Sequence, residues 1–128
     1  MAVDPLPTPS APPVAGPYSP AVRAGDWLLL SGQVGFGPDG TLVDGGIEVE
    51  TRQVLANLAA VFADCGTDWG HVARTTIFLT DLGNFATVNA LYEGVIGAHR
   101  PARTTVGVAG LPAGASVEIE CWVFHPAQ

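Results

Sequence analysis

Positive charge is scarce in this sequence. Its 128 residues contain only five lysines and arginines against twelve aspartates and glutamates, which gives a formal net charge of −7. A protein that binds phosphate backbones needs clustered Lys and Arg side chains, and the five basic residues form no such cluster. We therefore expect no nucleic-acid partner.

Cysteine and long apolar runs are also nearly absent. The two cysteines, Cys65 and Cys121, belong to no CxxC pair, which predicts two free thiols in place of a disulfide framework or zinc ribbon. No basic segment followed by an apolar run opens the chain, and no stretch approaches the roughly 20 residues of a membrane span. We expect a cytoplasmic protein with no signal peptide and no membrane partner.

Charged residues make up only 13% of the chain, while 48% are hydrophobic. A single domain of this size exposes much of its surface, so the low charge indicates that part of that surface is buried against partner subunits. Six prolines lie within residues 1–17. Because proline donates no backbone hydrogen bond, residues 1–15 are expected to form a Pro-rich arm or at most an edge strand. Residues 16–128 then form the single domain.

The order of periodic segments predicts an α+β fold. Apolar spacing favours helices over residues 47–65, ended by Gly66, and from Asp81 or Asn84 to 96, ended by Gly97. Strands are expected in a short segment ending at Gly25, over 27–34 with both faces buried, and over 71–80, 103–108 and 117–123. This order predicts a mixed sheet with both helices packed on one face.

Two of these strands carry charged groups that are candidates for chemistry. Alternation separates Arg103 from Thr104 and Val106, and separates Glu118 and Glu120 from the apolar face of the last strand. If the apolar faces meet the helices, Arg103 and Glu118 lie together on the far face of the sheet. Arg103 is suited to bind a carboxylate, and either glutamate is a candidate general base.

The standard catalytic motifs are missing. The histidines at 71, 99 and 125 show no metal-ligand spacing, and Ser31 lies outside a G-x-S-x-G elbow. The glycines at 35, 37 and 40 belong to no phosphate or dinucleotide motif. Tyr18, Ser31 and Asn89 are polar residues able to line a pocket. We expect no metal and no cofactor.

Seven segments, taken in order, resemble the RidA/YjgF family. They are Gly16-Pro-Tyr-Ser, Leu30-Ser-Gly-Gln, Glu50-Thr-Arg-Gln-Val-Leu-Ala-Asn-Leu, Thr75-Thr-Ile-Phe-Leu-Thr-Asp, Phe85-Ala-Thr-Val-Asn-Ala-Leu-Tyr, Arg100-Pro-Ala-Arg-Thr-Thr-Val and Val117-Glu-Ile-Glu. The resemblance implies a chorismate-mutase-like fold and a homotrimer whose sheets line an inner barrel, with three sites in clefts between subunits. It also implies hydrolysis of reactive 2-imino acids or their enamine tautomers to 2-keto acids and ammonia.

The resemblance further implies a role for each matching residue. Arg103 matches the arginine that binds the substrate carboxylate, and Glu118 matches the glutamate that positions or activates water. Tyr18, Ser31 and Asn89 match residues that line the pocket, and Thr105 falls where many members carry a cysteine or a small residue. A 2-iminobutanoate/2-iminopropanoate deaminase is thus the leading interpretation.

Two alternatives stay open at this point. One is a trimeric protein that binds small carboxylates without turnover, and the other is a deaminase or hydrolase adapted to a larger pathway intermediate. A ribonuclease is disfavoured by the net charge of −7.

Overall fold

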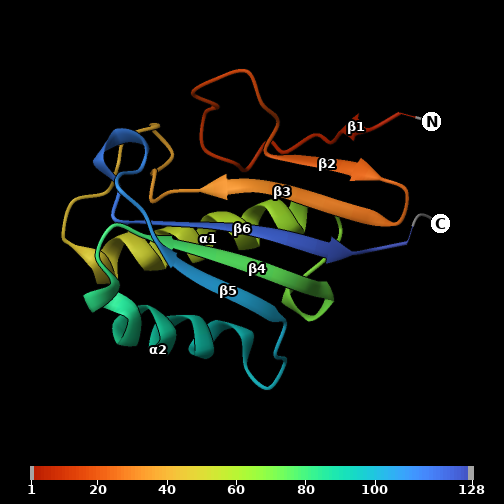
Figure 1. Ribbon diagram of the computed structural model, residues 1–128. Coiled ribbons are helices and arrows are strands. Elements are labelled where there is room, and N and C mark those ends of the chain that lie inside the picture. The colour runs from red at the N-terminus through yellow and green to blue at the C-terminus, as the bar shows by residue number, and fades with distance from the viewer. Residues whose placement is uncertain (1, 127–128) are drawn as a thin grey trace.

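The core of the fold is a sheet of six strands in the order β1-β2-β3-β6-β4-β5 (Figure 1). The computed structural model describes residues 2–126. β4 and β5 are parallel and every other pair is antiparallel, which confirms the predicted mixed sheet. The strands are β1 (Asp4–Pro5), β2 (Ala21–Ala24), β3 (Trp27–Gln33), β4 (Val72–Leu79), β5 (Ala102–Gly107) and β6 (Val117–Phe124).

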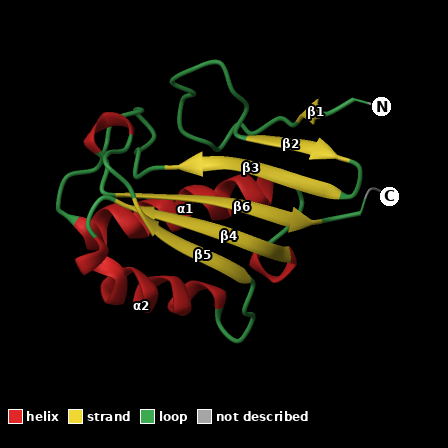
Figure 2. Cartoon of the chain, in the orientation of Figure 1, coloured by secondary structure: helices red, strands yellow, loops and turns green. Residues whose placement is uncertain are grey.

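Both α-helices pack on the same face of this sheet, as the sequence predicted (Figure 2). They are α1 (Ile47–Asp64) and α2 (Phe85–Ile96), and short 3₁₀ turns occupy Trp69–His71, Leu82–Asn84 and Pro112–Gly114. Their apolar stripes meet the inward side chains of β6 and β4, among them Ile119, Val123 and Ile77. α1 is followed by Gly66 at φ +76°, a left-handed conformation that glycine adopts at little cost.

The start of α2 differs in detail from the prediction, and α1 contains buried polar residues. Asp81 accepts a hydrogen bond from the Gly83 backbone (2.8 Å) and begins the 3₁₀ turn that leads into α2, whereas the Asn84 side chain caps nothing. Thr51 and Asn57 are polar residues of α1, yet both are buried. Asn57 donates to the carbonyl oxygens of Val34 (3.2 Å) and Phe36 (2.9 Å), so it holds the segment after β3 against the helix.

The expectation that β3 is buried on both faces is wrong for the described chain. Leu28 and Leu30 are buried, while Trp27 is exposed and Leu29 is only partly covered. Both helices lie on the other side of the sheet, so no element of residues 2–126 covers this face in full. We call it the open face.

The open face carries an aromatic cluster at one end. The ring of Trp27 lies edge-on to Trp122 (centroids 6.4 Å apart) and to Phe124 (5.2 Å), across β3 and β6. The exposed fractions of Trp122 and Phe124 are 48% and 46%. A cluster of large apolar side chains on an exposed face is typical of an interaction surface, in agreement with the low charge of the chain.

The Pro-rich arm joins the edge of the sheet. β1 pairs with β2, and the Leu6 amide donates to the carbonyl oxygen of Ala21 (3.0 Å). An edge position suits a proline, because its missing N–H is not needed on the outer side. The division into an arm and a domain at residue 15 stays a prediction.

Two further predictions concern the thiols and the membrane. Cys65 and Cys121 are both free, as predicted, and burial raises the pKa of the Cys121 thiol well above its ordinary range. No helix within residues 2–126 is long and apolar enough to cross a membrane.

Replacing Asn57 by alanine tests its role in holding the segment after β3. The variant removes the amide that donates to the carbonyl oxygens of Val34 and Phe36, of which the Val34 oxygen still accepts from the Phe36 amide. The loss should lower the free energy of unfolding by about 1–3 kcal/mol. Urea denaturation measures this difference. Gln53→Ala is the matched control, since Gln53 donates a hydrogen bond to the Asn57 side chain (2.8 Å) but none to the segment after β3 within residues 2–126. An equal loss in both variants would contradict the assignment.

Candidate functional site

Arg103 lies on the helix-covered face of the sheet, beside α2. It is level with Thr75 across the parallel β4–β5 pair, and the Thr75 hydroxyl shares a hydrogen bond with the Tyr92 hydroxyl of α2 (2.8 Å). The guanidinium carbon of Arg103 lies 5.5 Å from the ring centroid of Phe85 and 5.4 Å from that of Tyr92. Two cation–π contacts therefore hold the guanidinium without using its hydrogen-bond donors.

The Arg103 side chain lines a cavity of about 310 Å³ between α2 and the start of β5. Asn89 and Tyr92 of α2 form one wall, and Arg100 and Pro101 form another. Among residues 2–126, no carboxylate lies within ion-pair distance of Arg103, while Arg100 is 3.8 Å from Glu93. We call this space the arginine cavity. Its unpaired guanidinium is arranged to bind a carboxylate bidentately.

Glu118 lies in a different cavity, of about 190 Å³, near the carboxyl end of β3. We call it the glutamate cavity. Tyr18, Gly32 and Phe36 also line it. Burial raises the pKa of the Glu118 carboxyl above its ordinary value, and the negative charge of Glu120 adds to the rise. A carboxylate with a raised pKa is a better proton acceptor near neutral pH than an ordinary one.

Gly32 allows the carboxyl of Glu118 to reach this position. A Cβ atom at Gly32 would lie 2.2 Å from Oε2 of Glu118 and 2.8 Å from its carboxyl carbon. Real atoms do not approach so closely, so any larger residue at position 32 would displace the carboxyl group. A glycine inside a strand often marks such a close approach.

Ser31 forms hydrogen bonds with the backbone next to the glutamate cavity. Its hydroxyl donates to the carbonyl oxygen of Ser19 (2.7 Å), and its amide donates to that of Pro20 (3.0 Å). These bonds tie the segment that follows Tyr18 to β3. Ser31 thus supports the wall on which Tyr18 lies, and Tyr18 itself is half exposed to the cavity.

The two charged residues do not lie together on one face of the sheet, which corrects the prediction. Glu118 pairs with Phe78 on β4, whereas Arg103 is level with Thr75, three residues earlier on the same strand. Odd spacing along a strand reverses the side, so Glu118 is on the open face and Arg103 on the helix-covered face. Within one chain the predicted site is divided into two halves. Arg103 and Asn89 form one half; Tyr18, Glu118 and the nearby Ser31 form the other.

Thr105 belongs to the Arg103 side of the sheet. It follows Arg103 by two residues and pairs with the buried Ile77 of β4. Its hydroxyl oxygen is buried and has no hydrogen-bond partner within residues 2–126. A buried hydroxyl without a partner is costly, so a ligand that supplies one would be stabilised here.

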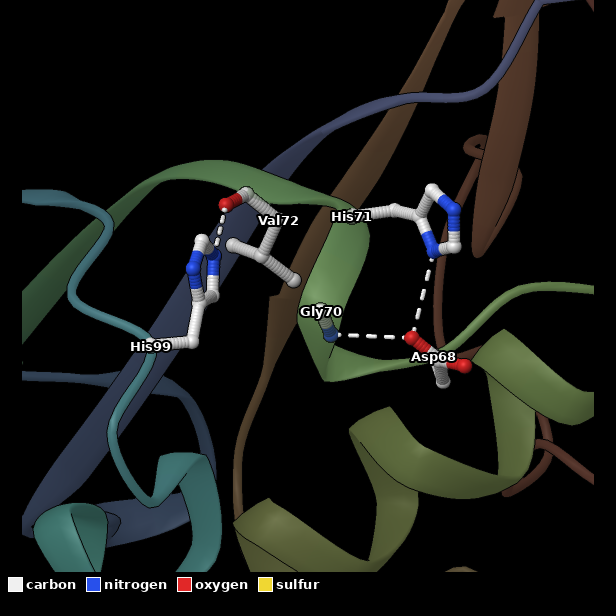
Figure 3. A network of polar contacts seen from close by, with 5 residues as sticks. All are labelled: Asp68, Gly70, His71, Val72 and His99. Atoms are coloured by element: carbon white, nitrogen blue, oxygen red, sulfur yellow. Dashed lines mark hydrogen bonds and ion pairs between the residues drawn. The ribbon is translucent and has the colours of Figure 1, made fainter.

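Two of the three histidines, His71 and His99, take structural positions near the start of β4 (Figure 3), while the third, His125, lies against Arg23. Asp68 accepts hydrogen bonds from the Gly70 amide (2.9 Å) and lies 3.2 Å from Nδ1 of His71. His99 donates from Nε2 to the carbonyl oxygen of Val72 (2.7 Å), which fixes the segment ahead of Arg103. No metal-binding group of three or more His, Cys, Asp or Glu side chains occurs among residues 2–126.

Several residues of the two cavities were not predicted from the sequence. Gly32, Phe36 and Pro112 line the glutamate cavity together with part of the Pro-rich arm, and Arg100 lines the arginine cavity. Tyr92 of α2 is buried in the core, and its ring also contacts the Arg103 guanidinium. The only sequence signal among these is the glycine inside an apolar strand at position 32.

Comparisons with known proteins point to one family. The model of the family Endoribonuclease L-PSP matches residues 8–125. The Arabidopsis thaliana protein named Reactive Intermediate Deaminase A, chloroplastic, is 44% identical over 115 residues, which are 89% of this chain but only 62% of that protein. A Mus musculus protein named 2-iminobutanoate/2-iminopropanoate deaminase is 43% identical over 114 residues, 88% of this chain and 84% of that one. The crystal structure of yeast YEO7 is similar with a TM-score of 0.93 and 35% identity, over 97% of this chain and 99% of that one.

Substitution of Glu120 tests the origin of the raised pKa of Glu118. Glu120→Gln removes one of the two causes, so the pKa of the Glu118 carboxyl should fall while burial keeps it above the ordinary value. A ¹³C NMR titration of the Glu118 carboxyl carbon measures the change. Glu93→Gln, on α2, is the control and should leave this titration unchanged; an identical curve in both variants would refute the coupling.

Proposed function

The chain belongs to the RidA/YjgF family, as its resemblance predicted, and from this premise we propose that it hydrolyses reactive 2-imino acids to 2-keto acids and ammonia. We expect 2-iminopropanoate, 2-iminobutanoate and their enamine tautomers as substrates. The observation that carries the proposal is the unpaired guanidinium of Arg103, held between two aromatic rings beside a cavity. Two relatives bear deaminase names, which supports the same reaction.

The protein needs mainly to place the substrate and one water molecule in contact, because the carbon of a protonated imine is already electrophilic. Arg103 binds the substrate carboxylate, and Asn89 and Thr105 line that half of the site. Glu118 accepts a proton from one water molecule, whose oxygen bonds to the electrophilic carbon of the protonated imine and gives a tetrahedral carbinolamine. Glu118 then returns this proton to the amine nitrogen. As the carbon–nitrogen bond breaks, Glu118 takes the proton of the new hydroxyl group, so the carbonyl of the 2-keto acid forms and ammonia leaves, to be protonated by Glu118 or solvent. Holding water and imine in contact lowers the entropic part of the barrier.

The division of the site between two faces of the sheet supports a site made by two copies of the chain. We propose a homotrimer in which Arg103, Asn89 and Thr105 of one copy face Glu118, Tyr18 and Ser31 of the next. The exposed aromatic cluster of Trp27, Trp122 and Phe124 on the open face supplies the apolar surface that such an assembly needs. Cyclic assemblies of identical chains join two different surface patches in this way.

The ribonuclease activity in the family's name is a weaker candidate for this chain. The net charge is −7, and the arginine cavity, which is lined by two of the five basic residues, is also lined by Glu93. A polyanion gains little from such a surface. A cytoplasmic location stays a prediction, and so does the exact imine.

Loss of the Arg103 guanidinium should abolish most of the activity. We expect kcat/KM of Arg103→Ala for 2-iminopropanoate to fall on the order of 10²-fold, because a charge-assisted bidentate contact to the carboxylate is removed. The assay couples the protein to a serine dehydratase and follows how it suppresses semicarbazone formation from the trapped imine.

Arg100→Ala is the matched control, since Arg100 lines the same cavity but is engaged with Glu93 and exposed. It should retain activity within a few-fold of the wild type. Wild-type kinetics in Arg103→Ala would remove the proposed anchor. A Glu118→Gln variant that binds 2-keto acids normally but has lost turnover distinguishes the enzyme from a pure binding protein.

Mixing two inactive variants tests whether each site is shared between copies. In equal mixtures of Arg103→Ala and Glu118→Gln chains, unfolded and refolded together, about a quarter of the shared sites should contain both intact residues. Activity should therefore return to about a quarter of the wild-type value in such a mixture. Refolded single variants are the controls. A mixture that stays as inactive as they are would place both residues in one chain's site.

A further inference from the structure

The Pro-rich arm contacts the rest of the chain at a second place, beyond its pairing with the sheet edge. After β1 and Leu6, the chain turns so that Ser10 meets the carboxyl end of α1. The Ser10 amide donates to one carboxylate oxygen of Asp64 (2.8 Å), and its hydroxyl donates to the other (2.9 Å). Ala11 packs against the core beside this contact. The segment that follows is therefore held at a defined place.

That segment forms a wall of the glutamate cavity. The arm contributes four consecutive residues to the lining, Pro12 to Ala15, and Pro13 also packs against the loop at Gly40. Val34 and Phe36 also line this cavity. Among residues 2–126, Glu118 is the only charged residue that lines this cavity. Tyr18 and Gln33 add polar groups elsewhere in the lining, whereas the arm side is apolar.

We propose that this apolar wall binds the side chain of the imino acid and makes the protein selective for branched aliphatic substrates, those derived from leucine-like amino acids, over 2-iminopropanoate. This inference rests on the proposed function. The imine carbon carries a carboxylate, a nitrogen and a side chain. Arg103 of one copy takes the carboxylate and Glu118 of the next supplies the water, so the proposal places the remaining substituent, the side chain, against the arm wall that lines the same cavity as Glu118.

The chemistry of the lining selects the class of side chain. Aliphatic groups are stabilised on leaving water in proportion to the area buried, and the proline, valine and alanine side chains of the arm wall offer no hydrogen bonds to a polar side chain placed against them. A carboxylate side chain would meet the charge of Glu118 and is excluded. Each further methylene group that enters the cavity should raise affinity several-fold.

Substitution of Val14 tests whether the arm wall binds the substrate side chain. Val14 lines the cavity, yet it lies on the arm and is 44% exposed, so enlarging it does not disturb the core. Val14→Trp fills the cavity from the arm side. Val3→Trp is the matched control, because Val3 is an exposed valine of the same arm that does not line the cavity.

The first measurement is calorimetric binding of two stable keto acids, pyruvate and 4-methyl-2-oxopentanoate, to the assembled protein. Wild type and Val3→Trp should bind the branched acid at least about tenfold more tightly than pyruvate. Val14→Trp should lose most of that preference, because its affinity for the branched acid falls more than its affinity for pyruvate. The second measurement is turnover of the two corresponding imines, generated by an amino-acid oxidase, and the ratio of kcat/KM should change in the same direction.

Each outcome decides the inference. Equal affinities for the two acids in the wild type, or an unchanged preference in Val14→Trp, would overturn the side-chain subsite even if both imines are hydrolysed. A preference that Val14→Trp abolishes, in a protein that hydrolyses neither imine, would support the subsite and refute the deaminase. Failure of the two proposals is thus distinguishable.

Discussion

The registers of β4 with its two neighbours determine what this molecule can do. The parallel register with β5 brings Arg103 level with Thr75 and toward α2, while the antiparallel register with β6 brings Glu118 level with Phe78 and toward the open face. A shift of one residue in either pairing would reverse the side of every group on that strand. The separation of the cation from the base therefore follows from hydrogen-bond registers of the sheet, not from flexible loops.

The placement of Arg103 also explains how a chain with so little charge maintains an unpaired cation. The rings of Phe85 and Tyr92 contact the guanidinium through their π faces, and the hydroxyl of Tyr92 is bonded to Thr75. These contacts leave the donors of the guanidinium available, whereas a carboxylate partner would occupy them. Glu118 is treated in the opposite way, since burial and Glu120 both disfavour its charged form. The proposed general base, Glu118, and the proposed carboxylate-binding residue, Arg103, thus lie in different environments on opposite sides of one sheet.

Most elements could be predicted from the sequence, and the exceptions have physical causes. The two helices and the strands around them follow from apolar period and from glycine stops, which are local signals. The side on which Arg103 lies was predicted wrongly, because Val106 was assumed to face the helices; β5 is an edge strand, and Val106 instead faces outward with 37% of its surface exposed. Periodicity identifies the two faces of a strand but not which one the core covers. The Pro-rich arm lines the glutamate cavity because Ser10 is bonded to Asp64. These two residues are 54 positions apart in the sequence, so no local sequence pattern predicts their contact.

The positions of the three tryptophans give the protein built-in optical probes. Trp69 packs edge-on against Phe62 (4.8 Å between centroids) and near Tyr92 on the helix side, whereas Trp27 and Trp122 lie together on the open face. Fluorescence of Trp69 therefore reports the integrity of the core within a chain. Emission from the open-face pair instead reports whether water or another surface lies against the sheet. A variant that keeps only Trp69 would therefore report folding, and one that keeps only Trp27 and Trp122 would report association. Both processes can be followed by the wavelength of tryptophan emission, without an attached dye.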